Sequence, residues 1–257
     1  MQLPPRVNVL GVGVSVLNLD SAVAILASAV ASRTRGHVCV TGVHGVMESQ
    51  ADPALRRIHN RSLLTTPDGM PMVWLGRLAG HRTMDRVYGP ELMERVFEWS
   101  GASGATHFFY GGGPGVAEQL RERLEQRFPG VRIVGTYTPP FRPLNADEEK
   151  ELIAQVAACR PDFLWVGLST PKQERFMDAY GPKLDATVMM GVGAAFDFHA
   201  GRVRQAPRWI QRSGFEWFYR MCAEPRRLWK RYLTNNPRFV VRIVAQRLGL
   251  RSYPLET

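Results

Sequence analysis

The chain has 257 residues, of which 45% are hydrophobic and 22% are charged, as in globular proteins with a sizeable core. This balance argues against intrinsic disorder. The three cysteines, Cys39, Cys159 and Cys222, lie far apart without a CxxC pair, which argues against a disulfide framework or a cysteine-rich zinc site and favours the cytosol. The sequence predicts no membrane-spanning helix, because no run of about 18 apolar residues is present. It predicts no signal peptide, because the N-terminus lacks the order of basic, apolar and small residues.

Charge divides the chain in two. Residues 1–199 hold 20 basic and 20 acidic side chains, whereas residues 200–257 hold 13 basic and 3 acidic ones. The whole net charge of +10 therefore lies in the last fifth of the chain. We predict a catalytic α/β domain over residues 1–200 and a basic, amphipathic, helical appendage over residues 201–257.

Short apolar runs alternate with helical patterns before residue 200. Strands are predicted at residues 7–12, 37–42, 62–66, 106–112, 131–137, 163–168 and 187–192. Helices are predicted at residues 20–33, 89–100, 114–127, 146–159 and 171–180. Strands that are apolar throughout and separated by helices indicate a Rossmann-like, mainly parallel sheet with helices on both faces.

A glycine-rich loop follows the fourth predicted strand. Ligands of such sheets bind beyond the carboxyl ends of the strands. Gly111, Gly112 and Gly113 would let backbone amides approach a diphosphate, and Pro114 suits the first position of the next helix. A tight turn explains the same residues equally well. The loop is neither GxGxxG nor a Walker motif, and the next strand ends without an acidic residue, which disfavours a dinucleotide oxidoreductase.

Asp68 lies in the turn "TTPDGMP" (65–71) after the third predicted strand. Pro, Asp and Gly are common turn residues, so a structural role explains them. A carboxylate at the end of a sheet strand would also serve as a general base toward a sugar hydroxyl. The residues alone leave both interpretations open.

The stretch "LSTPKQERF" (168–176) predicts a helix start. Thr170 fits the N-cap, Pro171 the first helical position and Gln173 the capping box. Lys172 and Gln173 would project from this helix start toward a phosphate or an acceptor sugar.

We expect no metal in the chemistry. Asp197 and His199 are too few for a metal site, and the DxE spacing of Asp147 and Glu149 reads better as the acidic first turn of a helix capped by Asn145.

Several motifs together resemble the WecG/TagA/CpsF family of bacterial glycosyltransferases over nearly the whole chain. They are Thr41, "PDG" (67–69), "GGGPGVAE" (111–118), "FPGVRIVG" (128–135), "VGLSTPKQE" (166–174), "GVGAAFDFHAGRVRQAP" (191–207) and "EWFYRMCAEPRRLWKRY" (216–232). The resemblance implies inverting transfer of an N-acetylhexosamine-type sugar, or its uronate, from a UDP-sugar to a sugar on a polyprenyl diphosphate.

The same resemblance implies roles for individual residues. Asp68 stands at the family's proposed base, Thr41 at its active-site threonine and Gln173 at its PKQE glutamine. Asp197 closes the GVG…FD motif near the nucleotide. Gly193 of that motif, Phe141 of "PPF" (139–141), Lys172 and the glycine loop complete the expected substrate-binding set, and no cofactor is implied.

The tail combines aromatic and basic side chains. Its candidates for contact with a membrane or with the acceptor diphosphate are Trp217, Arg220, Arg226, Arg227, Trp229, Lys230 and Arg231, on helices broken near Pro225. Such a helix suits an anionic membrane surface, since each basic residue near anionic lipid contributes roughly 1 kcal/mol. A docked helix with a solvated charged face, or a nucleic-acid grip, would use the same residues, but no nucleic-acid motif accompanies them.

The sequence favours one function and leaves two competing functions open. We expect a metal-independent enzyme attached peripherally to the inner face of the cytoplasmic membrane, with no nucleic-acid partner. A homo-oligomer with an inter-subunit active site is compatible with the sequence. An NAD-type oxidoreductase and a non-catalytic UDP-sugar binding module are the competing functions.

Overall fold

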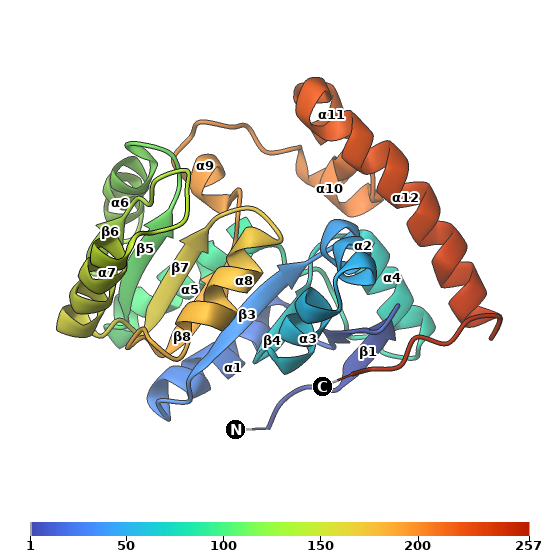
Figure 1. The fold of residues 1–257 in the computed structure, drawn as a ribbon, viewed down its shortest axis with the longest axis horizontal. Helices are drawn as coiled ribbons and strands as arrows, with labels where there is room; N and C mark the ends of the chain where they lie inside the picture. The colour runs from blue at the N-terminus through green and yellow to red at the C-terminus, as the bar shows by residue number, and fades with distance from the viewer. Residues whose placement is uncertain (1, 257) are drawn as a thin grey trace. The chain divides into compact units, whose positions relative to one another are not determined.

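The computed structural model describes residues 2–256, except the side chain of Arg227 (Figure 1). Its strands are β1 (Arg6–Val9), β2 (Val12–Ser15), β3 (Gly36–Thr41), β4 (Leu64–Pro67), β5 (Thr106–Gly111), β6 (Arg132–Tyr137), β7 (Phe163–Gly167) and β8 (Val188–Gly191). Its helices are α1 (Leu19–Ala31), α2 (Val43–Ala51), α3 (Pro53–Arg61), α4 (Met70–Leu78), α5 (Gly89–Ser103), α6 (Val116–Arg127), α7 (Ala146–Cys159), α8 (Lys172–Tyr180), α9 (Ala195–His199), α10 (Arg208–Ser213), α11 (Glu216–Ala223) and α12 (Pro225–Arg247).

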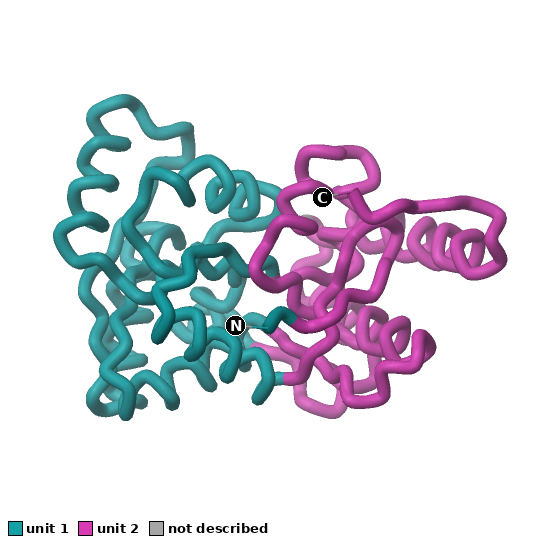
Figure 2. The backbone as a smooth tube through the Cα atoms, turned by 90° about the horizontal axis from the view of Figure 1, so that it is seen from below, with its two compact units in different colours: residues 1–3, 19–39, 89–204 teal, residues 4–18, 40–88, 205–257 magenta. Residues whose placement is uncertain are grey.

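The chain forms two compact units, shown in different colours in Figure 2. Unit 1 contains residues 1–3, 19–39 and 89–204, and unit 2 contains residues 4–18, 40–88 and 205–257. Strand β3 passes from unit 1 into unit 2 after Cys39. The basic C-terminal segment therefore forms one unit with two stretches from the first third of the chain.

The main sheet has six strands in the order β4-β3-β8-β7-β5-β6. The pairs β3–β8, β8–β7, β7–β5 and β5–β6 are all parallel. This architecture confirms the predicted α/β class. Parallel neighbours share one carboxyl edge, so the loops after β5, β7 and β8 in unit 1 lie on that edge.

Helices cover both faces of the sheet in unit 1 (Figure 1). Phe109 of β5 packs against Phe97 of α5 and edge-to-face against Phe196 of α9. The next residue, Tyr110, stacks on Phe176 of α8 with ring centroids 4.0 Å apart. Because successive strand side chains point to opposite faces, α5 and α8 lie on opposite sides of the sheet.

A buried histidine stands in the aromatic core of unit 1. The His107 ring stacks on Phe97 at 4.1 Å and on Phe163 at 5.5 Å between centroids. Trp165 donates from Nε1 to His107 Nδ1 over 3.0 Å, so that nitrogen carries no proton. Burial lowers the pKa of His107 to about 3.

The first predicted strand, residues 7–12, was wrongly placed in the main sheet. It covers three residues of β1, a turn and the first residue of β2. These two strands pair antiparallel as a separate hairpin in unit 2. Leu10 and Gly11 make the turn with φ of 52° and 83°. Positive φ at both residues is the geometry of tight hairpin turns, and glycine adopts it without steric cost.

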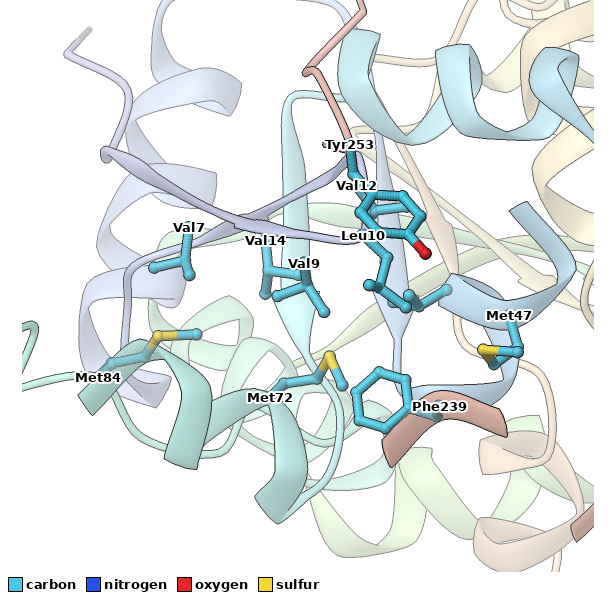
Figure 3. Packing of buried hydrophobic residues seen from close by; sticks show 11 residues of the cluster. Val7, Val9, Leu10, Val12, Val14, Met47, Met72, Met84, Phe239 and Tyr253 are labelled. Atoms are coloured by element: carbon cyan, nitrogen blue, oxygen red, sulfur yellow. The ribbon is translucent and has the colours of Figure 1, made fainter. Parts of the chain in front are cut away.

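The C-terminal helix completes the core of unit 2. Figure 3 shows Phe239 of α12 in one hydrophobic cluster with Leu10, Met47 and Met72. Leu228, one turn into the same helix, is also buried. The predicted helix break near Pro225 is confirmed, because α11 ends at Ala223 and Pro225 opens α12.

Candidate functional site

The glycine loop after β5 depends on backbone that only glycine tolerates. Gly111 has φ of +114°, and a Cβ there would lie 2.8 Å from the carbonyl of Gly167. Gly112 has φ of +78° and donates its amide to that carbonyl over 3.1 Å. Gly113 is different, since the nearest atom to a Cβ there is Val116 Cγ2 at 3.9 Å. The loop thus has two structurally required glycines and one position where a methyl group would make an ordinary contact.

The prediction that Pro114 opens the following helix is wrong by two residues. Helix α6 begins at Val116, after Gly115 in a left-handed conformation. Arg202 donates from Nη2 to the carbonyl oxygen of Pro114 over 3.2 Å and from Nε to Gln119. A guanidinium therefore lies beside the glycine loop in unit 1, which the sequence analysis did not assign.

Gln173 occupies a buried position at the start of α8. Its Nε2 donates to the Gly191 carbonyl over 3.3 Å and to Glu174 Oε1 over 3.1 Å. Its Oε1 is buried with no hydrogen-bond partner among the described residues, 3.3 Å from where a Gly193 Cβ would lie. The structure thus brings Gln173 and Gly193 together and leaves one amide oxygen able to accept from a ligand.

Thr170 does not cap α8 as predicted. Its hydroxyl donates to Glu174 Oε1 over 2.9 Å, and the helix begins at Lys172 without a side-chain cap. Burial raises the pKa of the Glu174 carboxyl, while its hydrogen bonds to Thr170 and Gln173 oppose that shift. The buried Glu174 carboxyl therefore holds the Gln173 side chain in position by accepting its hydrogen bond.

The other predicted residues of unit 1 are more exposed. Phe141, in the loop after β6, is 94% exposed, and Lys172 also faces solvent. Asp197 is half-buried in α9. His199 donates from Nε2 to the Pro90 carbonyl over 3.0 Å. Asn145 caps α7 with a full capping box, as the sequence predicted.

In unit 2, the structure brings Thr41 and Asp68 together. The Asp68 amide donates to the Thr41 carbonyl over 3.0 Å. A Cβ on Gly42 would lie 2.6 Å from the Asp68 carbonyl oxygen and 3.7 Å from its Oδ2, so the intervening glycine permits this close approach. Thr41 is 1% exposed, and its Oγ1 has no hydrogen-bond partner among the described residues.

A buried polar network lies in the same unit. Arg86 donates to Glu216 Oε2 and to Gln211 Oε1, each over 2.6 Å. Its guanidinium lies over the Tyr88 ring, 4.0 Å from the centroid. Arg86 is 8% exposed, so its charge is held almost out of water by these three partners.

Electrostatics connects this network to Asp68. Burial raises the pKa of the Glu216 carboxyl, Arg86 opposes that shift and the Asp68 charge adds to it. Burial and the charges of Glu216 and Asp68 raise the pKa of Tyr88. Burial disfavours the charged form of Arg220, but its neighbours, Asp68 among them, raise its pKa overall. Arg220 of α11 therefore contributes positive charge to the neighbourhood of Asp68.

Sequence reasoning missed Arg86, Tyr88 and Glu216. Arg86 and Tyr88 lie in a loop with no motif, and Glu216 reads as an ordinary acidic residue in the first turn of a helix. Only the contact between Arg86 and Glu216, which lie far apart in the sequence, shows that these residues form one network. The one signal in the sequence is the scarcity of acidic residues in the basic segment, where Glu216 is one of three.

The remaining tail candidates divide by exposure. Arg226, Trp229 and Lys230 are exposed, whereas Arg231 lies over the Tyr232 ring and Trp217 packs beside Phe218 and Tyr232. The side chain of Arg227 is outside the described residues. Over the described part of the chain, no helix is long and apolar enough to cross a membrane.

The two sets suit different chemical tasks. Unit 1 offers a backbone loop, a guanidinium and an amide acceptor, which bind phosphates and polar rings. Unit 2 offers a carboxylate that can abstract a proton. It also offers a buried hydroxyl and buried cations that can stabilise charge. Within residues 2–256, no group of three or more His, Cys, Asp or Glu side chains is arranged to hold a metal ion.

Comparison with known proteins gives one family. The model of the "Glycosyl transferase WecG/TagA/CpsF family" matches residues 7–253. A Bacillus spizizenii protein is 28% identical over 227 residues, covering 88% of this chain and 86% of the relative. A Bacillus subtilis protein is 28% identical over 188 residues, covering 73% and 70%. Both are named N-acetylglucosaminyldiphosphoundecaprenol N-acetyl-beta-D-mannosaminyltransferase.

Proposed function

Because the chain belongs to the WecG/TagA/CpsF glycosyltransferase family, we propose that it moves an N-acetylhexosamine-type sugar, or its uronate, from a UDP-sugar to a polyprenyl-diphosphate-linked sugar. The names of both Bacillus relatives support the transferred sugar class and the acceptor class. The observation that carries the proposal is the placement of Asp68, joined to the buried Thr41 and close to a buried network of charges. Polysaccharide synthesis at the cell envelope is the expected context.

Asp68 acts as the general base in this proposal. It takes the proton from the acceptor hydroxyl while that oxygen attacks the anomeric carbon, and the bond from that carbon to the UDP oxygen breaks with inversion. A positioned base contributes roughly 10²–10⁴-fold, so orientation and leaving-group stabilisation supply the rest. In this proposal the Thr41 hydroxyl, which has no partner among the described residues, holds a substrate oxygen.

The departing diphosphate needs positive charge and hydrogen-bond donors. In unit 1 these are the amides of the glycine loop, Arg202 beside Pro114, and Lys172 at the start of α8. In unit 2, Arg220 and the exposed basic residues of α12 are the candidates. We propose that the groups of one of these two sets replace a metal ion in neutralising the leaving group.

The nucleoside of the donor is assigned to residues of unit 1. The Gln173 Oε1 would accept a hydrogen bond from the base, and Gly193 keeps the space beside it open. Asp197 would bind the ribose and Phe141 would cover the base. Phe141 is 94% exposed, which leaves its ring available to stack on a ligand.

The surface of α12 supports a peripheral membrane attachment, and we propose that the cytoplasmic face is the one bound. Its exposed apolar side chains are Trp229, Leu233, Val240, Val241, Val244 and, just beyond the helix, Leu248 and Leu250. Exposed arginines and a lysine alternate with them, among them Arg226, Lys230, Arg238 and Arg247. Apolar side chains mixed with basic ones match the interface of an anionic bilayer.

The deciding assay measures UDP release from candidate UDP-sugars with a lipid-linked N-acetylglucosamine acceptor. Asp68→Asn should lower turnover by roughly 10² or more and leave UDP affinity in calorimetry unchanged. Asp85→Asn, an exposed aspartate in the same unit, is the matched control and should keep wild-type turnover. Wild-type turnover by Asp68→Asn would remove Asp68 from the mechanism.

Membrane attachment is tested by flotation with anionic liposomes. A truncation near residue 201 is unsuitable, because residues 205–257 supply Phe239 and Leu228 to the interior of unit 2. The triple variant Trp229→Gln, Val241→Gln, Leu248→Gln changes exposed positions only and should float far less than wild type. Leu3→Gln, an exposed apolar position outside unit 2, serves as control, and equal flotation of all three proteins would refute attachment through α12.

A further inference from the structure

A pocket at the end of the chain is separate from every residue assigned above. It has a volume of about 240 Å³ and lies wholly in unit 2. The lining residues that matter are Arg56, Arg242, Arg251, Ser252, Tyr253 and Glu256. Three arginines and one glutamate give this small space an excess of positive charge, and we call it the C-terminal pocket.

Two buried donors of the pocket lack acceptors. The Tyr253 hydroxyl and Arg56 Nε are buried and have no hydrogen-bond partner among the described residues. Tyr253 as a whole is 8% exposed. An unsatisfied buried polar group costs about 1–3 kcal/mol, so an acceptor from outside the protein would relieve both atoms.

The pocket is held in shape by hydrogen bonds to the terminal segment. Asn8 donates from Nδ2 to the Tyr253 carbonyl and Asn60 donates from Nδ2 to the Glu256 carbonyl, each over 2.7 Å. Arg56 Nη2 pairs with Glu256 Oε2 at 2.9 Å. The Arg251 guanidinium lies 5.2 Å from the centroid of the Tyr253 ring. These contacts fix the donors before a ligand arrives, which lowers the entropic cost of binding.

The charges select the ligand. Glu256 neutralises Arg56, whereas Arg242 and Arg251 have no ion pair among the described residues. Two guanidinium groups, a phenol and a serine hydroxyl match a group with several acceptor oxygens and negative charge. We propose that the C-terminal pocket binds a phosphate group.

The neighbouring surface indicates a phosphate carried by a lipid. Val241, Leu248 and Leu250, close in sequence to the two unpaired arginines, are 68%, 67% and 76% exposed. A phospholipid headgroup in the pocket would leave its acyl chains beside these side chains. Binding of a phospholipid headgroup rests on the proposed membrane attachment, whereas binding of a soluble phosphate does not.

The first experiment titrates inorganic phosphate into the full chain by calorimetry. Tyr253→Phe removes one donor without changing charge, and it keeps the ring in the cluster of Figure 3, so the fold is preserved. Tyr253→Phe and Arg242→Gln should each weaken binding about tenfold. Arg82→Gln removes one exposed charge of unit 2 outside the pocket and should leave phosphate affinity unchanged.

The second experiment separates the two sources with phosphatidylglycerol vesicles. Weaker vesicle binding by Tyr253→Phe, together with competition by inorganic phosphate, assigns the pocket to a lipid headgroup. Phosphate binding that depends on Tyr253, with unchanged vesicle binding, assigns it to a soluble phosphate. If neither probe responds to Tyr253→Phe or Arg242→Gln, the pocket holds only water and the proposal is overturned. UDP release by Tyr253→Phe with a soluble acceptor analogue tests the proposed transferase function separately.

Discussion

Arg86 and Glu216 form a buried ion pair of 2.6 Å, with side chains only 6% and 16% exposed. The pair joins the loop before α5 to the first turn of α11, 130 residues later. It therefore anchors the basic C-terminal segment within unit 2 next to the candidate base Asp68. A segment that looks like an appendage in the sequence is thereby an internal part of the unit that carries the proposed base.

Removing one partner of this pair should be costly for stability. Arg86→Met removes the direct ion-pair partner of the buried Glu216 carboxylate, a change that costs about 3–5 kcal/mol of unfolding free energy. Glu216→Gln keeps a hydrogen-bond acceptor for Arg86 and should cost less. Urea denaturation measures the unfolding free energies of both variants.

The control for that prediction is the exposed pair of Arg77 and Asp85, 3.3 Å apart. Asp85→Asn should change the unfolding free energy by under about 1 kcal/mol. If Arg86→Met is no more destabilising than Asp85→Asn, the buried pair does not hold the C-terminal segment in place.

Two buried histidines predict a loss of stability in mild acid. Burial lowers the pKa of His59 in unit 2 to about 4 and that of His107 in unit 1 to about 3. Below pH 6.5 the unfolded chain binds protons that the folded chain excludes. Stability should therefore be complete above pH 6.5 and fall by roughly 2 kcal/mol per histidine between pH 7 and pH 5.

Urea denaturation at several pH values measures this slope. His107→Gln keeps an acceptor for Trp165 and removes one titrating group, so its slope should be smaller by about one proton. A slope equal to that of wild type would show that His107 does not titrate in this way.

Most elements of unit 1, though not the short helix α9, were predictable because their signals are local. Helix α7, with its Asn145 capping box, and the apolar strands β5 and β7 follow directly from periodicity and caps. The short helices α2, α3 and α4 escaped detection because each is brief and flanked by turn residues. The hairpin turn at Leu10 escaped because the apolar run continues through it.

The candidate site was predictable where it follows strands. Thr41, Asp68 and the glycines stand at strand ends, where parallel sheets bind ligands. The pairing of Arg86 with Glu216 joins positions 130 residues apart, and no periodicity encodes such a contact. The excess of basic residues in the C-terminal segment predicts a surface appendage. Its attachment to unit 2 depends instead on a few buried residues such as Phe239, which composition does not identify.

Sugar transfer should continue after metal removal. The sequence has no DxD motif, and Arg202, Lys172 and the glycine loop offer the diphosphate a set of positive or donating groups instead. Dialysis against EDTA should leave the rate of UDP release unchanged. A loss of rate that Mg²⁺ or Mn²⁺ restores would contradict this expectation.

The glycine loop offers a test that separates ligand binding from folding. Gly113→Ala places a methyl group 3.9 Å from Val116 Cγ2, an ordinary contact, so thermal stability should stay near that of wild type. If the donor diphosphate lies against this backbone, the same methyl group should weaken UDP binding by about tenfold or more, since phosphate cradles require close backbone approach.

Gly111→Ala is the matched contrast. Its Cβ would lie 2.8 Å from the Gly167 carbonyl at a positive φ, so this variant should lose stability as well as UDP affinity. Calorimetry with UDP and thermal unfolding of both variants provide the two readouts. A Gly113→Ala protein that binds UDP as tightly as wild type would mean that the loop is a tight turn and that the diphosphate binds elsewhere.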